Sequence, residues 1–214
     1  MGQFKAFFPD HHHAEDVAPH LDCPINYVSW YDVARYCRRL SEAEGVPRDE
    51  MIFPPVEDIR PDRELVLPEN WLQRTGYRWP TEAEWEYACR GGTTTIRFFG
   101  TTDGPLAKYG WWRSTANERS WPVGLLRPNP FGLFDVLGNA GEWCFDRRLA
   151  YAEAPADGED TRTITPAAHR VYRGGTYQQM SKDLRSAKRD SADPTGGFSF
   201  NGFRVARTVR APSP

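Results

Sequence analysis

Apolar residues recur at helical spacing in a first stretch of the chain, between Ser29 and Gly45. Ser29 and Asp32 have the spacing of a capping box, in which two side chains satisfy free N–H groups at a helix start. Gly45 is typical of a helix end. The pattern therefore predicts a helix here, with an apolar stripe of Val33, Tyr36, Cys37 and Leu40.

A second helix is predicted between Thr81 and Gly91, where Thr81 and Glu84 repeat the capping-box spacing. Its apolar stripe consists of Trp85, Ala88 and Cys89. Because Cys37 and Cys89 then lie on buried helix faces, we expect free thiols and not disulfides.

The rest of the chain shows short β-like runs separated by Gly, Pro and Asn, which predict strands at residues 97–100, 132–137, 171–173 and 203–209. Residues 46–74 are rich in Pro and charge, and residues 151–166 are predicted to form a surface loop. Apolar residues that need burial recur in the first of these segments: Ile52, Phe53, Val56, Ile59, Leu65 and Leu67. The pattern indicates one α+β domain over residues 1–214, with two main helices and short antiparallel strands, because neither half could bury its own core.

Composition supports a folded chain without regular bundles. Eight Trp, nine Tyr and twelve Phe supply a core, while 18 Gly and 18 Pro require many turns. With 27 basic and 29 acidic residues, no nucleic-acid partner is expected. No apolar run is long enough to cross a membrane, and the first residues lack the apolar stretch of a secretion signal, so a cytoplasmic protein is expected.

Five ordered segments carry a family resemblance: NYVSWYD (26–32), GYRWPTEAEWEYACRGG (76–92), NPFGLFDVLGNAGEW (129–143), RVYRGGT (170–176) and GFRVA (202–206). In this order and spacing, the chain resembles the formylglycine-generating enzyme, or sulfatase-modifying factor, family from about residue 23 to 208. The resemblance implies a C-type-lectin-like fold of low regular content. The family usually begins earlier, so its N-terminal strands are expected to be missing from this chain.

The resemblance also implies a test for catalysis. Enzymatic members hold copper between two cysteines shortly after a Gly-Gly-Ser/Thr turn, since thiolates suit Cu(I). Residues 174–189 contain no cysteine, and Gln179 stands where the first ligand is expected. We therefore expect no copper and a catalytically inert protein.

The segment 138–143 resembles a calcium site of the family. Carboxylates of Asp135 and Glu142, with carbonyls of Gly138 and Ala140, would supply the oxygen ligands that calcium prefers. Alternatively, the two acids only accept hydrogen bonds from loop N–H groups. Gly141 replaces a Trp that usually borders the active-site groove; it either leaves the groove wider or serves a positive φ.

Arginines and histidines have simpler interpretations. Arg185, Arg189, Arg204 and Arg207 are expected to tie loops to carbonyls and carboxylates. The histidine triplet at 11–13 is expected to be solvated and not to bind metal.

A binding surface is predicted in residues 176–201, where aromatic, Met and short polar side chains gather as they do at rigid binding surfaces. Its candidates are Tyr177, Gln178, Gln179, Met180, Ser181, Asp190, Ser191, Phe198 and Phe200, with Trp112 extending the patch. Alternatively, Phe198 and Phe200 fill the core.

The sequence thus favours a non-catalytic module that binds a protein partner or a small molecule. It would serve a larger parent polypeptide, such as a kinase or protease, or act as a variable protein of a diversity-generating retroelement. One alternative is a metal-dependent oxidase or sulfoxide synthase with other ligands. Another is a structural subunit completed by a partner chain, which predicts aggregation when the chain is made alone.

Overall fold

The two main helices begin where their capping boxes predict. This is a computed structural model, which describes residues 1–150, 163–165 and 168–210. Helix α2 (Trp30–Ala43) follows Ser29, whose Oγ accepts from the backbone N–H of Asp32 at 3.1 Å. Helix α3 (Glu82–Arg90) follows Thr81 and ends at Gly91, whose φ is +55°. Both predicted helices are confirmed, and a short helix α1 (Gly2–Lys5) precedes them.

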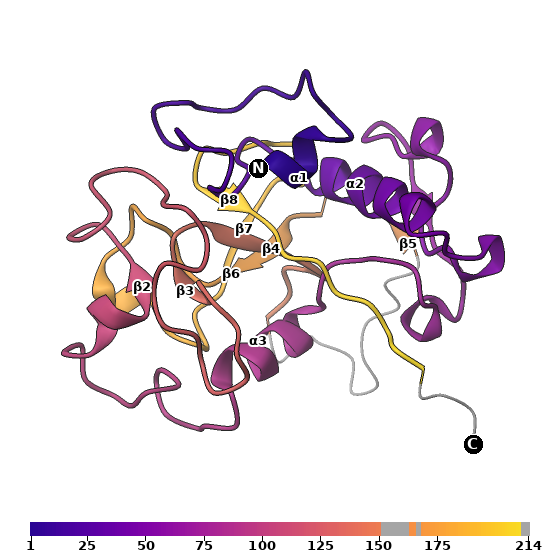
Figure 1. Ribbon diagram of the computed structural model, residues 1–214. Coiled ribbons are helices and arrows are strands. Elements are labelled where there is room, and N and C mark those ends of the chain that lie inside the picture. Colours follow the sequence, from indigo (N-terminus) through magenta and orange to yellow (C-terminus); the bar gives the residue numbers. More distant parts are fainter. Residues whose placement is uncertain (151–162, 166–167, 211–214) are drawn as a thin grey trace.

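In the part of the chain that the structure describes, eight short strands accompany the helices: β1 (Leu65–Val66), β2 (Gly110–Trp111), β3 (Leu137–Gly138), β4 (Gly141–Arg147), β5 (Thr163–Ile164), β6 (Arg170–Arg173), β7 (Asp190–Ala192) and β8 (Asn201–Gly202). The main sheet has the order β7-β6-β4-β8. In it β4 runs antiparallel to β6 and parallel to β8. Strands β1 and β5 form an antiparallel pair, and β2 and β3 a parallel pair. The chain has the expected α+β fold of few helices and short strands (Figure 1).

The predicted strands are only partly correct. The strand at 171–173 is confirmed as β6, but residues 97–100 form a turn, closed by backbone hydrogen bonds between Arg97 and Gly100. Of residues 132–137, only Leu137 lies in a strand, and of residues 203–209 only Ala206 forms a bridge, with Arg78. The predicted loop at 151–166 lies mostly outside the described residues, and its Thr163–Ile164 part is strand β5.

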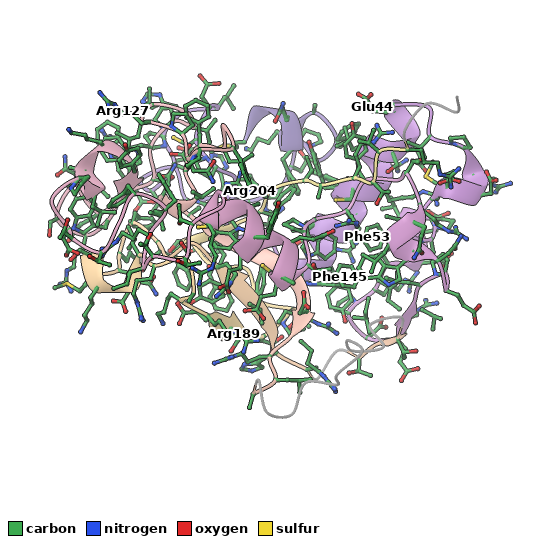
Figure 2. The ribbon with its side chains drawn as sticks, turned by 90° about the horizontal axis from the view of Figure 1, so that it is seen from below. Glu44, Phe53, Arg127, Phe145, Arg189 and Arg204 are labelled. Carbon is green, nitrogen blue, oxygen red and sulfur yellow. The ribbon has the colours of Figure 1, made fainter. Side chains whose placement is uncertain are left out.

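Strand β4 separates two apolar clusters. Trp143 and Phe145 pack into the first cluster with Trp30, whereas Cys144 between them packs into the second with Trp85. The sheet lies between α2 and α3, and Figure 2 marks Phe145 close to Phe53 in the first cluster. Of the apolar residues predicted to be buried in 46–74, all are buried except Val56, which is half-buried.

The expectation that arginines tie the loops to carboxylates and carbonyls is confirmed for Arg189 and Arg204. Arg185 is exposed, and Arg207 lies over the Tyr77 ring. An arginine that was not predicted does the same. Arg97, which is 2% exposed, donates to the carbonyls of Leu184 (2.8 Å) and Ser181 (2.7 Å). Arg189 pairs with Glu82 at the start of α3. No helix among the described residues has the length and apolar character needed to cross a bilayer.

Candidate functional site

Gln179 is held as a bridge within its loop. Its Oε1 accepts from the Thr176 N–H at 3.2 Å, and its Nε2 donates to Asp190 Oδ2 at 3.1 Å. Its backbone carbonyl accepts from the Arg113 N–H at 3.0 Å. The preceding glycines, Gly174 and Gly175, have φ of +93° and +77°, so the chain turns sharply into this loop. The amide at the expected ligand position is therefore committed to protein contacts.

The four thiols lie elsewhere, and all are free and buried, which confirms the expectation of free cysteines. Cys89 and Cys144 belong to the second cluster, where their Sγ atoms lie 3.7 Å from the Val136 carbonyl and 3.8 Å from the Glu142 carbonyl. Burial raises the pKa of Cys89 to about 12 and that of Cys144 well above its usual value. Both thiols are therefore protonated at neutral pH and packed in apolar surroundings.

Tyr177 does not belong to the surface, contrary to the prediction. The residue is only 1% exposed, and its hydroxyl lies 3.5 Å from Ser199 Oγ. The exposed neighbours are Gln178, which donates to the Tyr177 hydroxyl at 3.1 Å, and Met180, which is 49% exposed. Tyr177 therefore supports the loop from beneath.

Three half-buried aromatic rings form what we call the aromatic surface: Tyr172, Phe198 and Phe200. Phe198 stacks on Phe200 with ring centroids 5.4 Å apart, and Phe200 lies 6.1 Å from Tyr172. Phe198 also packs against the first cluster, so each alternative for this pair is partly right. Tyr172 is absent from the sequence-based candidates; its signal is the alternation in β6, where Val171 and Arg173 are buried on either side.

A charged and polar group adjoins this surface. Asp190 accepts from Gln179 and pairs with Lys188 at 2.5 Å. Burial, with the nearby Asp190 carboxylate, raises the pKa of Tyr172 to about 12, so its hydroxyl stays protonated at neutral pH. The surface therefore offers hydrogen-bond donors and acceptors beside apolar rings.

Gly141 is explained by close packing and by neither predicted alternative. Its φ is not positive, and a Cβ there would lie 2.9 Å from Tyr172 Cδ2 and 3.1 Å from Asn201 Oδ1. Tyr172 thus fills the room that a large side chain at Gly141 would need. Asn201 is fully buried, and neither of its side-chain polar atoms has a hydrogen-bond partner within the described ranges.

The remaining candidates are separated. Ser181 starts a 3-10 helix and offers its carbonyl to Arg97, and Ser191 lies in β7 opposite Val171. Trp112 is half-buried against the second cluster, so its ring lines that core next to the Gln179 loop.

The predicted calcium ligands fit a cation in part. Asp135 Oδ2 accepts from the Gly124 N–H at 2.8 Å, while its Oδ1 is buried and has no hydrogen-bond donor among the described residues. Burial, with a smaller effect from Glu142, raises the pKa of Asp135. Both oxygens of Glu142, however, accept from Arg204, and one also accepts from Trp85 Nε1.

Within the described residues, no three His, Cys, Asp or Glu side chains gather as a metal group would require. One oxygen of Asp135 is therefore left for a cation, whereas Glu142 is neutralised by Arg204 and does not fit direct ligation.

Comparison with known proteins identifies the family. Residues 5–209 match the sulfatase-modifying factor enzyme 1-like domain. Serine/threonine-protein kinase pkn1 of Chlamydia pneumoniae is 32% identical over 153 residues, which cover 67% of this chain and 24% of the kinase. The formylglycine-generating enzyme of Streptomyces coelicolor is 36% identical over 166 residues, which cover 66% of this chain and 52% of the enzyme.

Among solved structures, Treponema denticola variable protein 1 shares the fold with a TM-score of 0.76 at 24% identity, over 96% of this chain and 80% of that one. The chain spans about a quarter of the length of the kinase relatives and about half of that of the Streptomyces enzyme. The chain therefore belongs to the sulfatase-modifying factor family, which includes the formylglycine-generating enzymes.

Proposed function

We propose that this chain is a non-catalytic binding module on the formylglycine-generating enzyme scaffold. The observation that carries the proposal is the state of the Gln179 loop. An amide bonded to Thr176 and Asp190 occupies the place of an expected thiolate, and residues 174–189 contain no cysteine. An amide cannot replace thiolate ligands for Cu(I). The loop therefore keeps the Gly-Gly turn but lacks the ligands that the oxidase chemistry requires.

The binding surface consists of the aromatic surface and the exposed loop beside it. Phe198 and Phe200 offer rigid apolar rings, Met180 offers an adaptable apolar side chain, and Gln178 offers an exposed amide. Aromatic residues and Met are enriched at the centres of protein interfaces, where they bury much area with few rotatable bonds. Because Tyr177 and Gln179 fix the loop from within, little ordering entropy is lost on binding.

A protein is the partner that we favour, and a small molecule is the other candidate ligand. The kinase relatives support this, because the region shared with this chain is only a quarter of each kinase and is therefore one module beside other parts of a larger protein. A similar chain is a chaperone protein, LppX of Paenibacillus barcinonensis, at 27% identity over 86% of this chain. A module of this kind would contribute recognition to a larger kinase or protease assembly.

Calcium remains part of the proposal as a structural ion. The buried, unpartnered Oδ1 of Asp135 is the group that a cation would satisfy, with the carbonyls of Gly138 and Ala140 as further ligands. Such an ion would stiffen the loop before β4 and leave the aromatic surface to the partner.

The binding test uses the purified chain and the proteins encoded beside its gene, mixed in a calorimeter. Met180→Asp places a charge on the predicted surface, and Val209→Asp makes the same change at an 80% exposed site outside it. We expect binding that is lost in Met180→Asp and kept in Val209→Asp. The absence of binding to any neighbour, or equal binding by both variants, would contradict the proposal.

Elemental analysis provides an independent test of the inert scaffold. One copper or iron per chain, retained through purification, would contradict the non-catalytic assignment and favour the oxidase or sulfoxide synthase alternative. Calcium alone would support the proposal.

A further inference from the structure

A cavity of about 680 Å³ lies apart from the aromatic surface, and its lining includes no residue of 176–201. It opens between the N-terminal segment, the loop around residue 134 and the residues that follow β8. Its volume is that of a site for a small organic molecule, which is typically about 300–1,000 Å³.

Aromatic and aliphatic groups form the walls of the cavity. Phe4, Tyr36 and Phe203 pack against one another, with ring centroids 5.2–6.1 Å apart. At the mouth, four apolar side chains are exposed to water: Leu21 (64%), Val123 (57%), Phe134 (42%) and Val205 (42%). An apolar ligand would therefore remove both the wall and the rim from water, which is the main source of affinity in such sites.

Arg204, which is labelled in Figure 2, provides a hydrogen-bond donor in the lining of this cavity. Its Nε and Nη2 donate to the two oxygens of Glu142, and Nη2 also donates to the Phe134 carbonyl. Within the described residues Nη1 has no acceptor, and a quarter of the side chain is exposed. An incoming acceptor would thus meet a guanidinium that Glu142 already holds in place.

The charges of the lining select the ligand. Three carboxylates, those of Asp22, Asp135 and Glu142, line the cavity together with one guanidinium, that of Arg204. An anion would be repelled, and a cation could not accept from Arg204 Nη1. A neutral amide meets both requirements, because it carries no charge and its carbonyl is a hydrogen-bond acceptor.

We propose that this cavity binds a small apolar molecule that carries a peptide-like amide. The amide carbonyl accepts from Arg204 Nη1, and the apolar part packs on Phe203 and on the exposed side chains at the mouth. This site is independent of the proposed binding surface, so either proposal can fail without the other.

The test uses the full chain in EDTA, with any tag at the C-terminus because Met1 forms part of the cavity wall. N-acetyl-L-leucinamide is the probe, and its binding is followed by saturation-transfer NMR. N-acetylglycinamide keeps the amides but lacks the apolar side chain. The hydrocarbon 2-methylpentane keeps an apolar group but lacks the amide. We expect saturation of the leucine compound and much weaker signals from both analogues.

Two variants locate the site. Val205→Trp places a large ring at the mouth, and Leu72→Trp makes a matched change at a 40% exposed residue outside the cavity. We expect Val205→Trp to weaken binding at least about tenfold and Leu72→Trp to change it by less than about twofold. Both variants should keep the wild-type melting temperature within a few degrees, because both sites are on the surface.

Three outcomes would overturn the proposal. These are no saturation of the leucine compound at millimolar concentration, equal binding by Val205→Trp and Leu72→Trp, and equal signals from the glycine and leucine compounds. The last result would show that the apolar wall contributes nothing.

Discussion

Gly141→Ala is expected to destabilise the protein, because Tyr172 occupies the space beside this glycine. The new Cβ would lie 2.9 Å from Tyr172 Cδ2, closer than carbon atoms approach in folded proteins, and 3.1 Å from Asn201 Oδ1. Since φ at Gly141 is not positive, backbone strain does not contribute, and the effect measures packing alone. Overpacking of this kind lowers the free energy of unfolding by about 1–3 kcal/mol.

The measurement is urea unfolding followed by tryptophan fluorescence, with Gly104→Ala as the matched control. Gly104 also lacks a positive φ and has no atom within 4 Å of an added Cβ, so its substitution should be neutral or slightly stabilising. In thermal unfolding, each kcal/mol should lower the melting temperature by about 2–4 °C for a chain of this size.

A double-variant cycle identifies the cause. In a Tyr172→Ala background the added methyl has room, so Gly141→Ala should be less destabilising there than in wild type by about 0.5–3 kcal/mol. Equal stabilities of Gly141→Ala and Gly104→Ala, or strict additivity with Tyr172→Ala, would refute the reasoning.

Three further predictions concern buried charges and thiols. At pH 8 a thiol reagent should label the native chain far more slowly than the denatured chain, in which all four cysteines react. The reason is that burial shields the thiols and raises their pKa, to about 12 for Cys89. Rapid labelling of one native thiol would contradict this. Because burial raises the pKa of Asp135 in the folded state, the native protein binds more protons, and this group lowers stability as pH rises above 3.8. In EDTA at pH 7, Asp135→Asn should therefore melt higher than wild type, and calcium should raise the melting temperature of wild type only; a calcium effect retained in Asp135→Asn would exclude this ligand. Arg204→Met leaves the Glu142 carboxylate buried without its cation, which should lower the free energy of unfolding by about 3–5 kcal/mol. Adding Glu142→Gln should recover most of this loss, as measured by chemical denaturation. No recovery in the double variant would show that loss of the ion pair is not the cause.

Local signals predicted the helices well and the strands poorly. The capping pairs Ser29–Asp32 and Thr81–Glu84 act within one turn, so they are readable from the sequence. Strand β4 is not, because its first five residues are all buried and show no alternation of apolar and polar positions. The run at 97–100 has β-forming residues, but Arg97 is used to hold two distant carbonyls and the chain turns instead.

In the candidate site, too, local features could be predicted from the sequence, whereas contacts between distant segments could not. The family resemblance located Gln179 after the Gly-Gly turn, and the sequence alone shows that residues 174–189 contain no cysteine. The burial of Tyr177, the contribution of Tyr172 and the pairing of Glu142 with Arg204 depend on contacts between distant segments. No spacing within one segment encodes such contacts.

The loop after Gly175 is fastened at a few points and is otherwise open to replacement. Tyr177, Leu184 and Ser186 are buried and hold the backbone in place. Solvent-exposed positions are interspersed with these anchors: Gln178, Met180, Lys182, Arg185 and Ala187. A designed library that randomises the second set and keeps the first should therefore yield folded proteins that differ only in this part of their surface.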